Sequence, residues 1–208
     1  MIFIFSYERE EMLTQVLSNL SDYEPIVIDD GSSFFIPNCI RYEHEGKQGF
    51  WKKWRDAFEM CKKSDDDFFM FMPDDFLNVD MDRILSLHEQ LKDKPYVYNI
   101  INDGREWSWL PFKGVQINEH TMQIGFTDCG FFCNRKALEA IDFKIDPVDP
   151  RRWKNNPNLS SGVGQKLTKS FTLKGVKMYK PMKSLAYHGN HESKMNPEER
   201  KINPLISL

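Results

Sequence analysis

The sequence predicts an α/β fold in which helices flank a mostly parallel central sheet, and three observations support this prediction. Apolar runs of strand length alternate with amphipathic runs of helix length through residues 1–100, a pattern typical of parallel sheets with right-handed crossovers. Acidic or polar residues directly follow several of the strand-like runs, at the position where α/β sheets bind ligands. The 208 residues are 40% hydrophobic and 28% charged, a balance typical of one globular domain.

Strands and helices are expected in alternation through the first part of the chain. The run MIFIFS at residues 1–6 is short, apolar and β-rich, which favours a central parallel strand. Residues 9–20 then place apolar side chains at helical spacing. The same reasoning predicts strands within 25–33, 39–45, 66–76 and 96–100, and helices over 50–63 and 81–93.

The second part of the chain is less regular. A strand leading into a helix is expected within 125–141. Pro, Asn, Ser and Gly make 146–164 a long loop of the kind that carries function. A helix is expected over 166–174 with Gly175 as its stop, and a strand over 176–181.

Charge, cysteine content and hydropathy exclude several classes of protein. The net charge of −3 gives no overall attraction to nucleic acid or anionic membranes. The four cysteines form no Cys-x-x-Cys pair, so buried free thiols in a reducing compartment are favoured over a zinc site. No stretch approaches the roughly 20 apolar residues of a membrane span. We therefore expect a soluble, cytoplasmic protein.

Two pairs of aspartates follow strand-like runs. Asp74 and Asp75 come directly after a buried run and a proline. Adjacent carboxylates repel each other, and a divalent cation such as Mg²⁺ or Mn²⁺ would relieve that repulsion; the alternative is a solvated acidic turn. Asp29 and Asp30 could hydrogen-bond a ribose hydroxyl or a base N–H, or form an ordinary Asp-Gly turn.

The order of these motifs resembles the nucleotide-binding half of GT-A fold glycosyltransferases. IFIFSYERE leads into a helix, then IVIDDGSS, a further strand and helix, and FMFMPDDF. The likeness is to the large inverting family of spore-coat and cellulose-synthase-like enzymes. Its members carry Thr-Tyr-Asn-Arg, Val-Asp-Asp-Gly-Ser and a metal-binding Asp-x-Asp in this order. The resemblance covers residues 1–80 well and residues 120–192 loosely. It implies one GT-A (Rossmann-like) domain over 1–208, with a nucleotide-sugar-binding half at 1–100 and an acceptor half with the C-terminal tail at 101–208.

The resemblance assigns the nucleotide and metal sites to the first half. Asp75 would be the principal ligand of Mn²⁺ or Mg²⁺, with Asp74 near the ribose or the metal, and Asp30 would contact the uridine. Two departures matter: Glu8 replaces the usual Asn, and Pro73 replaces the first acid, so that fewer protein ligands would hold the metal. The residues expected to line the nucleotide pocket are Ser6, Tyr7, Arg9, Asp29 and Asp30.

Basic residues near the start of the 50–63 helix are also candidates. The segment EGKQGFWKKWRDAF resembles the family's Gly-rich segment, and Lys47 and Arg55 would approach the diphosphate or the uracil. The alternative is that Lys52, Lys53 and Arg55 form the solvated face of an amphipathic helix.

The second half contributes a general base, a histidine and an aromatic platform. By resemblance, Asp128 would take the acceptor proton in an inverting transfer, or it would cap the following helix. The family's usual Glu-Asp pair is absent from LSSGVGQKL, which favours Asp128 but leaves a retaining mechanism open. His188 would complete the metal site, since imidazole suits Mn²⁺. Trp109 offers a flat face for a sugar ring, or packs in the core.

The function implied is metal-dependent transfer of a sugar from a UDP-hexose or UDP-deoxyhexose to a hydroxyl acceptor. The acceptor would be a glycan, a glycoprotein or modified DNA. The net negative charge of the chain argues mildly against DNA, which is itself an anion. Transferases of this type occur in bacteria, large viruses and phages, so a viral member acting in the host cytoplasm is one interpretation. Two alternatives stay open: a nucleotidyltransferase, although SYERE lacks the glycines of its signature, and a non-catalytic nucleotide-sugar-binding module.

Overall fold

The computed structural model describes residues 1–102, 114–128, 130–157 and 159–188. Within this part of the chain, nine strands form one mixed sheet and two short strands form a separate pair. The strands of the sheet are β1 (Ile2–Ser6), β2 (Ile26–Asp29), β3 (Ile40–Arg41), β4 (Phe68–Pro73), β6 (Tyr96–Asn99), β7 (Val115–Gln116), β8 (Thr121–Ile124), β9 (Phe131–Asn134) and β10 (Lys177–Pro181). The separate pair is β5 (Phe76–Leu77) with β11 (Tyr187–His188).

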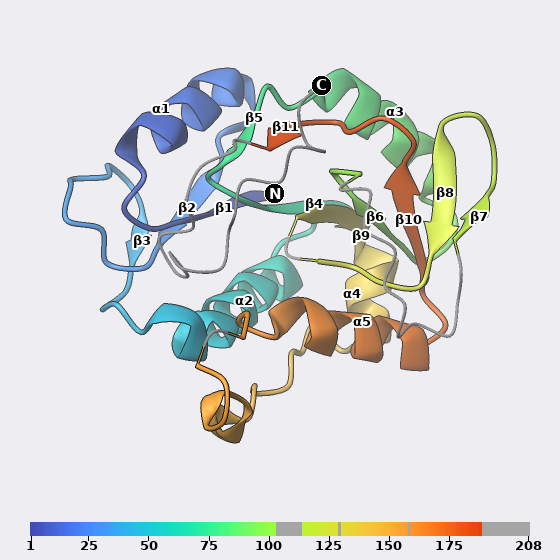
Figure 1. Cartoon of the computed structure of the whole chain (residues 1–208). Coiled ribbons are helices and arrows are strands. Elements are labelled where there is room, and N and C mark those ends of the chain that lie inside the picture. The colour runs from blue at the N-terminus through green and yellow to red at the C-terminus, as the bar shows by residue number, and fades with distance from the viewer. Residues whose placement is uncertain (103–113, 129, 158, 189–208) are drawn as a thin grey trace.

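Helices cover both faces of the sheet, as expected for the α/β class (Figure 1). The helices on one face are α1 (Glu10–Asn19) and α3 (Met81–Leu91), and those on the other are α2 (Gly46–Lys63), α4 (Arg135–Ala140) and α5 (Val163–Leu173). Two 3₁₀ turns, η1 (Ser21–Tyr23) and η2 (Pro150–Trp153), complete the described elements. Each face has its own apolar core, so the sheet is buried on both sides, which explains the continuous apolar runs of β1 and β4.

The strand order places a topological switch point between β1 and β4. The sheet runs β3-β2-β1-β4-β9-β6-β10-β8-β7. From β1 the chain passes through α1 to β2 on one side, and it returns through α2, on the opposite face, to β4 on the other side. Strands β1, β2, β3 and β4 are parallel. Ligands of such sheets bind outside the carboxyl ends of the strands where the order reverses, here just after Ser6 and Pro73.

An aromatic cluster holds α2 under these strands. The Trp54 side chain is fully buried, and its ring stacks on Phe5 of β1 with 4.7 Å between centroids and on Phe131 of β9 with 5.6 Å. Phe71 of β4 lies 5.1 Å from the same ring. Aromatic pairs of this kind contribute about 0.5–1.5 kcal/mol each beyond their buried area. The packing therefore fixes α2 relative to three strands at once.

Several elements differ from the sequence prediction. Strand β9 runs antiparallel between β4 and β6, and the hairpin of β7 and β8 was not predicted, because its strands are short and half-exposed and give little apolar periodicity. Helix α2 begins at Gly46, four residues before the predicted start. The predicted strand at 39–45 is reduced to two residues. None of the helices described is long and apolar enough to cross a membrane.

Gly130→Ala is expected to destabilise the protein through the ring of Phe76. A Cβ atom at Gly130 would lie 2.3 Å from Cε2 and 2.6 Å from Cζ of that ring, and forced overpacking typically costs about 1–3 kcal/mol. Phe76→Leu removes both atoms, so the cost of Gly130→Ala should be smaller in that background. The measurement is a double-mutant cycle of urea unfolding free energies, and additive costs would show that the ring is not the obstacle.

Candidate active site

Hydrogen bonds tie the carboxyl ends of β1 and β4 together. The Asp74 amide donates to the carbonyl of Phe5 at 3.1 Å, which continues the ladder past Pro73. The Ser6 hydroxyl donates to Oδ2 of Asp74 at 2.8 Å, and the Tyr7 amide approaches the same oxygen at 3.3 Å. Asp74 is 3% exposed. The first turn after β1 is therefore built around this one carboxylate.

Arg9 bridges the two adjacent carboxylates. Its Nη1 lies 3.0 Å from Oδ1 of Asp74 and 2.6 Å from Oδ2 of Asp75. All three side chains are nearly buried, at 9%, 4% and 1% exposed respectively. Two buried carboxylates side by side would be costly if nothing offset their charges. The guanidinium supplies a positive charge between them, in charge-assisted contacts with both.

The proton affinity of Asp74 reflects this setting. Burial raises the pKa of the Asp74 carboxyl to about 6, and the neighbouring charge of Asp75 adds to the rise. Arg9 and the hydrogen bonds from Ser6 and Tyr7 oppose it. A carboxyl with a raised pKa beside a second carboxyl is a frequent feature of functional sites.

His188 reaches Asp75 from the far end of the described chain. The pairing of β11 with β5 sets His188 opposite Phe76, and the two rings meet edge to face with 5.4 Å between centroids. The Nε2 atom lies 3.6 Å from Oδ2 of Asp75. The predicted partnership of these two residues in a metal site stays a prediction, but the fold does bring them together.

Asp29 and Asp30 have different contacts in the structure. Asp29 is fully buried, and its carboxylate accepts from the amide of Ser32 and pairs with Nε of Arg41 at 2.9 Å. This geometry is that of a turn-forming aspartate, and a role in substrate binding stays a prediction. Oδ1 of Asp30 lies 2.7 Å from Nζ of Lys53, and both side chains are almost fully buried.

The burial of Lys53 corrects one interpretation of α2. Lys53 is 1% exposed, so it does not belong to a solvated face of this helix. The ammonium also lies 5.3 Å from the centre of the Tyr42 ring. The signal was in the sequence: Lys53 falls three residues after Phe50 and four before Ala57, on the apolar stripe of the helix. A lysine at a core position needs a buried anion, and Asp30 is that anion.

His44 is the other residue that sequence reasoning missed. Its ring stacks on Tyr7 with 4.2 Å between centroids and 12° between planes, and its Nδ1 lies 3.2 Å from Oδ2 of Asp30. Gly31 makes this approach possible. It has φ +83, and a Cβ there would lie 3.0 Å from the amide nitrogen of His44. The Tyr7 ring face and the Asp30 carboxylate thus converge on one spot.

The predicted basic residues Lys47 and Arg55 lie on α2 but have other contacts. Lys47 donates from Nζ to the carbonyl of Pro157 in the 146–164 loop. Arg55 donates to Asp56 at 2.8 Å and lies over the ring of Trp51. Contacts of either residue with a diphosphate or uracil stay predictions. Trp109 lies outside the described residues.

Asp128 lies at the same edge of the sheet as the acidic pair. Because β9 runs opposite to β4, the residues before β9 emerge beside the carboxyl end of β4. Asn99, at the carboxyl end of β6, accepts from the hydroxyl of Thr127 at 2.7 Å. The amide of Thr127 donates to Oγ1 of Thr168 in α5, which donates back to the Thr127 carbonyl. These bonds fix the backbone on which Asp128 sits.

The first turn of α5 passes close to the Asp128 carboxylate. A Cβ built on Gly164 would lie 2.9 Å from Oδ1 of Asp128 and 3.1 Å from the Thr127 carbonyl oxygen, so a larger residue there would displace the Asp128 side chain. The half-buried Asp128 therefore lies against the amino end of α5.

The strand order and the helices on both faces of the sheet define a GT-A-like fold, as the sequence predicted. Among solved structures it is similar to residues 1–349 of S. aureus TarS, with a TM-score of 0.58 and 13% identity over 88% of this chain and 58% of that one. A second S. aureus TarS structure gives a TM-score of 0.55 and 14% identity over 86% of this chain and 36% of that one. The chain thus spans less than two thirds of the length of the first structure and about a third of the second. In sequence, it matches no family model and no curated protein.

Lys53→Met is expected to lower the free energy of unfolding by about 3–5 kcal/mol, since it leaves the carboxylate of Asp30 buried without its counter-charge. Urea titration followed by tryptophan fluorescence measures this loss. Lys52→Met is the matched control on the same helix, because Lys52 pairs with Glu45 at the surface and such pairs contribute at most about 1 kcal/mol. Equal losses in the two variants would contradict the buried pair.

Relative to the wild type, the Asp74→Asn variant is expected to gain free energy of unfolding as the pH rises. In the unfolded chain Asp74 loses its proton near its ordinary pKa, whereas the native carboxyl holds it to about pH 6. The native state therefore binds the extra proton between these values, and stability falls as the pH rises through this window. Relative to Asp74→Asn, the wild type should lose up to about 3 kcal/mol between about pH 4 and pH 7. The measurement is urea unfolding of both proteins at four pH values, with a chelator present. Unfolding free energies that change in parallel with pH would rule out the raised pKa of Asp74.

Proposed function

We propose that this chain is a glycosyltransferase that uses a nucleotide diphosphate sugar as donor. The observation that carries the proposal is the gathering of Tyr7, Arg9, Asp30, Asp74 and Asp75 outside β1, β2 and β4, at the switch point of a GT-A-like sheet. Fold alone hosts many activities, so the proposal depends on what these side chains can bind.

The nucleotide end of the site favours a base that offers an N–H group. The Asp30 carboxylate can only accept hydrogen bonds when ionised, and Lys53 holds a positive charge 2.7 Å away. The Tyr7 ring beside it offers a stacking face, which the His44 ring occupies in this structure. Uracil, with a flat ring and an N3–H donor, meets both requirements. UDP is therefore the proposed nucleotide, as the sequence predicted.

The acidic end of the site has the donor chemistry for Mn²⁺ or Mg²⁺. Asp75 and His188 offer a carboxylate oxygen and an imidazole nitrogen 3.6 Å apart, with Asp74 beside them. Within the described residues no group of three or more His, Cys, Asp or Glu is arranged to hold a metal. A cation here would therefore take its remaining ligands from phosphate oxygens and water, as these hard ions commonly do. When bound, it would neutralise the diphosphate as the leaving group.

The acceptor end of the site offers a general base. Asp128 lies at the same sheet edge, fixed through Thr127 to Asn99 and Thr168. In the proposed reaction its carboxylate takes the proton of the acceptor hydroxyl as that oxygen attacks the anomeric carbon. Attack from the face opposite the diphosphate inverts the configuration of the sugar. The proposed acceptor is a hydroxyl group of a glycan, a glycoprotein or modified DNA.

The test measures the release of UDP from UDP-sugars in the presence of Mn²⁺, with a coupled enzymatic assay as the readout. Asp75→Asn should reduce turnover at least about a hundredfold through lost stabilisation of the leaving group. Asp128→Asn should lower kcat about 10²–10⁴-fold while leaving the Kd for UDP unchanged. Ser86→Ala, at an exposed position of α3 whose hydroxyl accepts a hydrogen bond from Gln90, is the activity control.

Two outcomes would replace the proposal. UDP binding without turnover of any UDP-sugar would favour a non-catalytic nucleotide-sugar-binding module. Formation of a nucleotide sugar from a sugar phosphate and a nucleoside triphosphate would favour a nucleotidyltransferase. In either case the response to Asp128→Asn would be lost.

A further inference from the structure

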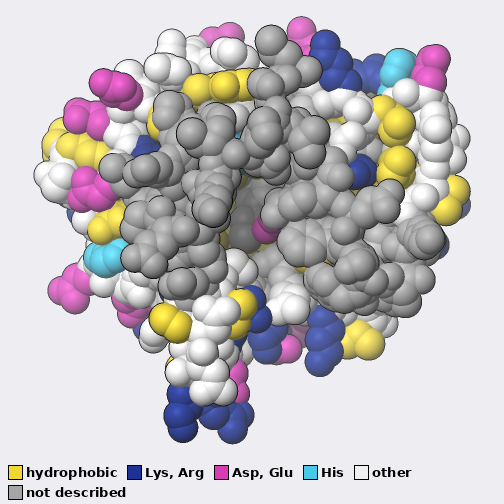
Figure 2. Space-filling view, viewed as in Figure 1, with side chains coloured by type: hydrophobic (Ala, Val, Ile, Leu, Met, Phe, Trp, Pro, Cys, Tyr) yellow, Lys and Arg dark blue, Asp and Glu magenta, His cyan; other side chains and the backbone are white. Residues whose placement is uncertain are grey.

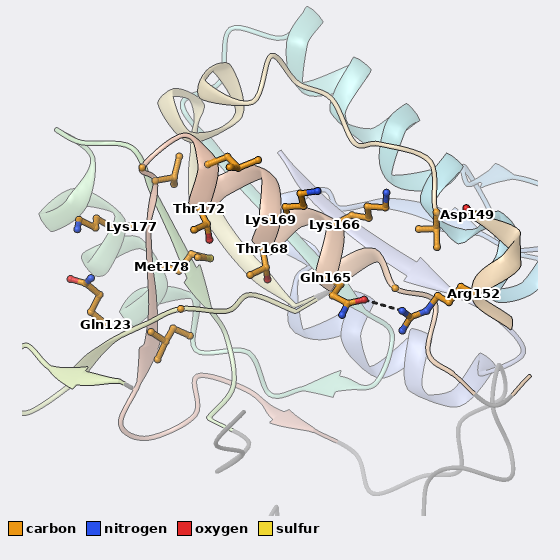
Figure 3. A pocket seen from close by; sticks show the side chains of 17 residues that line it. Gln123, Asp149, Arg152, Gln165, Lys166, Thr168, Lys169, Thr172, Lys177 and Met178 are labelled. Atoms are coloured by element: carbon orange, nitrogen blue, oxygen red, sulfur yellow. Dashed lines mark hydrogen bonds between the residues drawn. The ribbon is translucent and has the colours of Figure 1, made fainter. Parts of the chain in front are cut away.

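A pocket of about 720 Å³ lies beside α5, and it is lined by residues of α5, β8, β10 and the loop that carries η2. Figure 3 shows it extending from Lys177 and Gln123 on the strands to Asp149 and Arg152 on the loop, with Lys166 and Lys169 of α5 between them. None of the residues that bind or stack around Asp30, Asp74 and Asp75 lines it.

The pocket lies in a strongly cationic part of an otherwise acidic chain. Residues 150–188 contain nine Lys and Arg and no Asp or Glu, whereas the whole chain has a net charge of −3. Figure 2 shows Lys and Arg side chains gathered at the lower edge of the molecule, over α5 and the η2 loop. The one acid that lines the pocket, Asp149, is already paired with Arg151 at 2.5 Å. The pocket therefore attracts anions.

The lining combines cations with an apolar floor and neutral polar groups. Val148, Val176 and Met178 are buried beneath it. Arg152 forms a fixed wall, because it donates to Oε1 of Gln165 at 2.9 Å and to the carbonyl of Ser160 at 3.2 Å. Apolar floors suit the C–H faces of sugar rings, and ammonium groups suit phosphate or carboxylate substituents.

The shape and composition argue against two other polyanions. A membrane surface needs a flat or convex cationic face, whereas these lysines surround a concavity. Single-stranded nucleic acid binds through aromatic side chains that stack on its bases, and the described lining includes no aromatic residue. A carbohydrate chain that carries negative charges fits the observed lining better than either.

The pocket leads toward the predicted general base. Thr168 lines it and exchanges two hydrogen bonds with Thr127, the residue before Asp128. Gly125, on the same segment, lines it as well. A chain bound along α5 would therefore lie next to the segment that holds the Asp128 carboxylate.

We propose that this pocket binds an anionic oligosaccharide, one that carries phosphate or carboxylate groups, and holds it as part of the acceptor. The acceptor role rests on the proposed glycosyltransferase function, whereas the binding itself does not. Lys166 and Lys169 of α5 contact the anionic groups, and the floor contacts the sugar rings.

The test is calorimetric titration of the full chain with a galacturonic acid hexasaccharide, which carries carboxylates only, with neutral maltohexaose alongside. The double variant Lys166→Gln, Lys169→Gln should weaken hexasaccharide binding at least about tenfold, since it removes two charge-assisted contacts. The control Lys62→Gln, Lys63→Gln removes the same charge from exposed lysines elsewhere and should weaken it by less than about threefold. Equal losses in the two double variants, or equal binding of maltohexaose, would overturn the proposal.

Titrations with two other kinds of anion test whether the pocket binds a different ligand. A dT₁₀ oligonucleotide or phosphatidylserine vesicles that bind more tightly than the hexasaccharide, and lose that binding in the Lys166→Gln, Lys169→Gln variant, would reassign the pocket and overturn the proposal. Amide shifts in NMR spectra should concentrate at Gly125, Thr168 and Thr172, and shifts confined to other surfaces would also overturn it.

Failure of this inference can be told apart from failure of the proposed function. UDP binding that is weakened by Asp30→Asn but not by the Lys166→Gln, Lys169→Gln variant, together with no hexasaccharide binding, would remove the pocket proposal and leave the donor site intact. Hexasaccharide binding that depends on Lys166 and Lys169, without UDP binding, would keep the pocket and remove the acceptor role.

Discussion

The structure of the candidate site depends on the contact of one guanidinium with two buried carboxylates. Arg9 belongs to the turn after β1, and Asp74 and Asp75 belong to the turn after β4. Without a positive charge between them, the acids would repel each other in a setting with little water. The contact therefore joins the two strands at the switch point and keeps both carboxylates at the mouth of a sheet that is apolar on both faces.

The same principle recurs at the neighbouring strand. Asp30 after β2 is balanced by Lys53 from α2, and α2 is held by the stacking of Trp54 under β1 and β9. Packing of the aromatic core thus sets the position of the Lys53 ammonium, which lies against the Asp30 carboxylate proposed to meet the nucleobase. The charge balance at Asp30 therefore depends on the packing of the hydrophobic core.

The strands that lead to the acids, and the acids at their ends, could be predicted from sequence because each depends on a short local pattern. The run before Asp74 is apolar throughout, and a buried parallel strand leaves that pattern. Pairings between distant segments leave no local trace: β11 with β5, which brings His188 to Asp75, and the reversal of β9, which brings Asp128 to the same edge. Lys53 was misjudged because charge was weighed above its place on the apolar stripe of α2.

Asn99 anchors the segment that precedes Asp128. Its side chain donates to the Phe126 carbonyl at 3.4 Å and accepts from the Thr127 hydroxyl at 2.7 Å, so this backbone is tied directly to the carboxyl end of β6. The β7–β8 hairpin is held separately, by the pairing of β8 with β10 at the edge of the sheet. Substitutions in the hairpin are therefore insulated from the placement of Asp128.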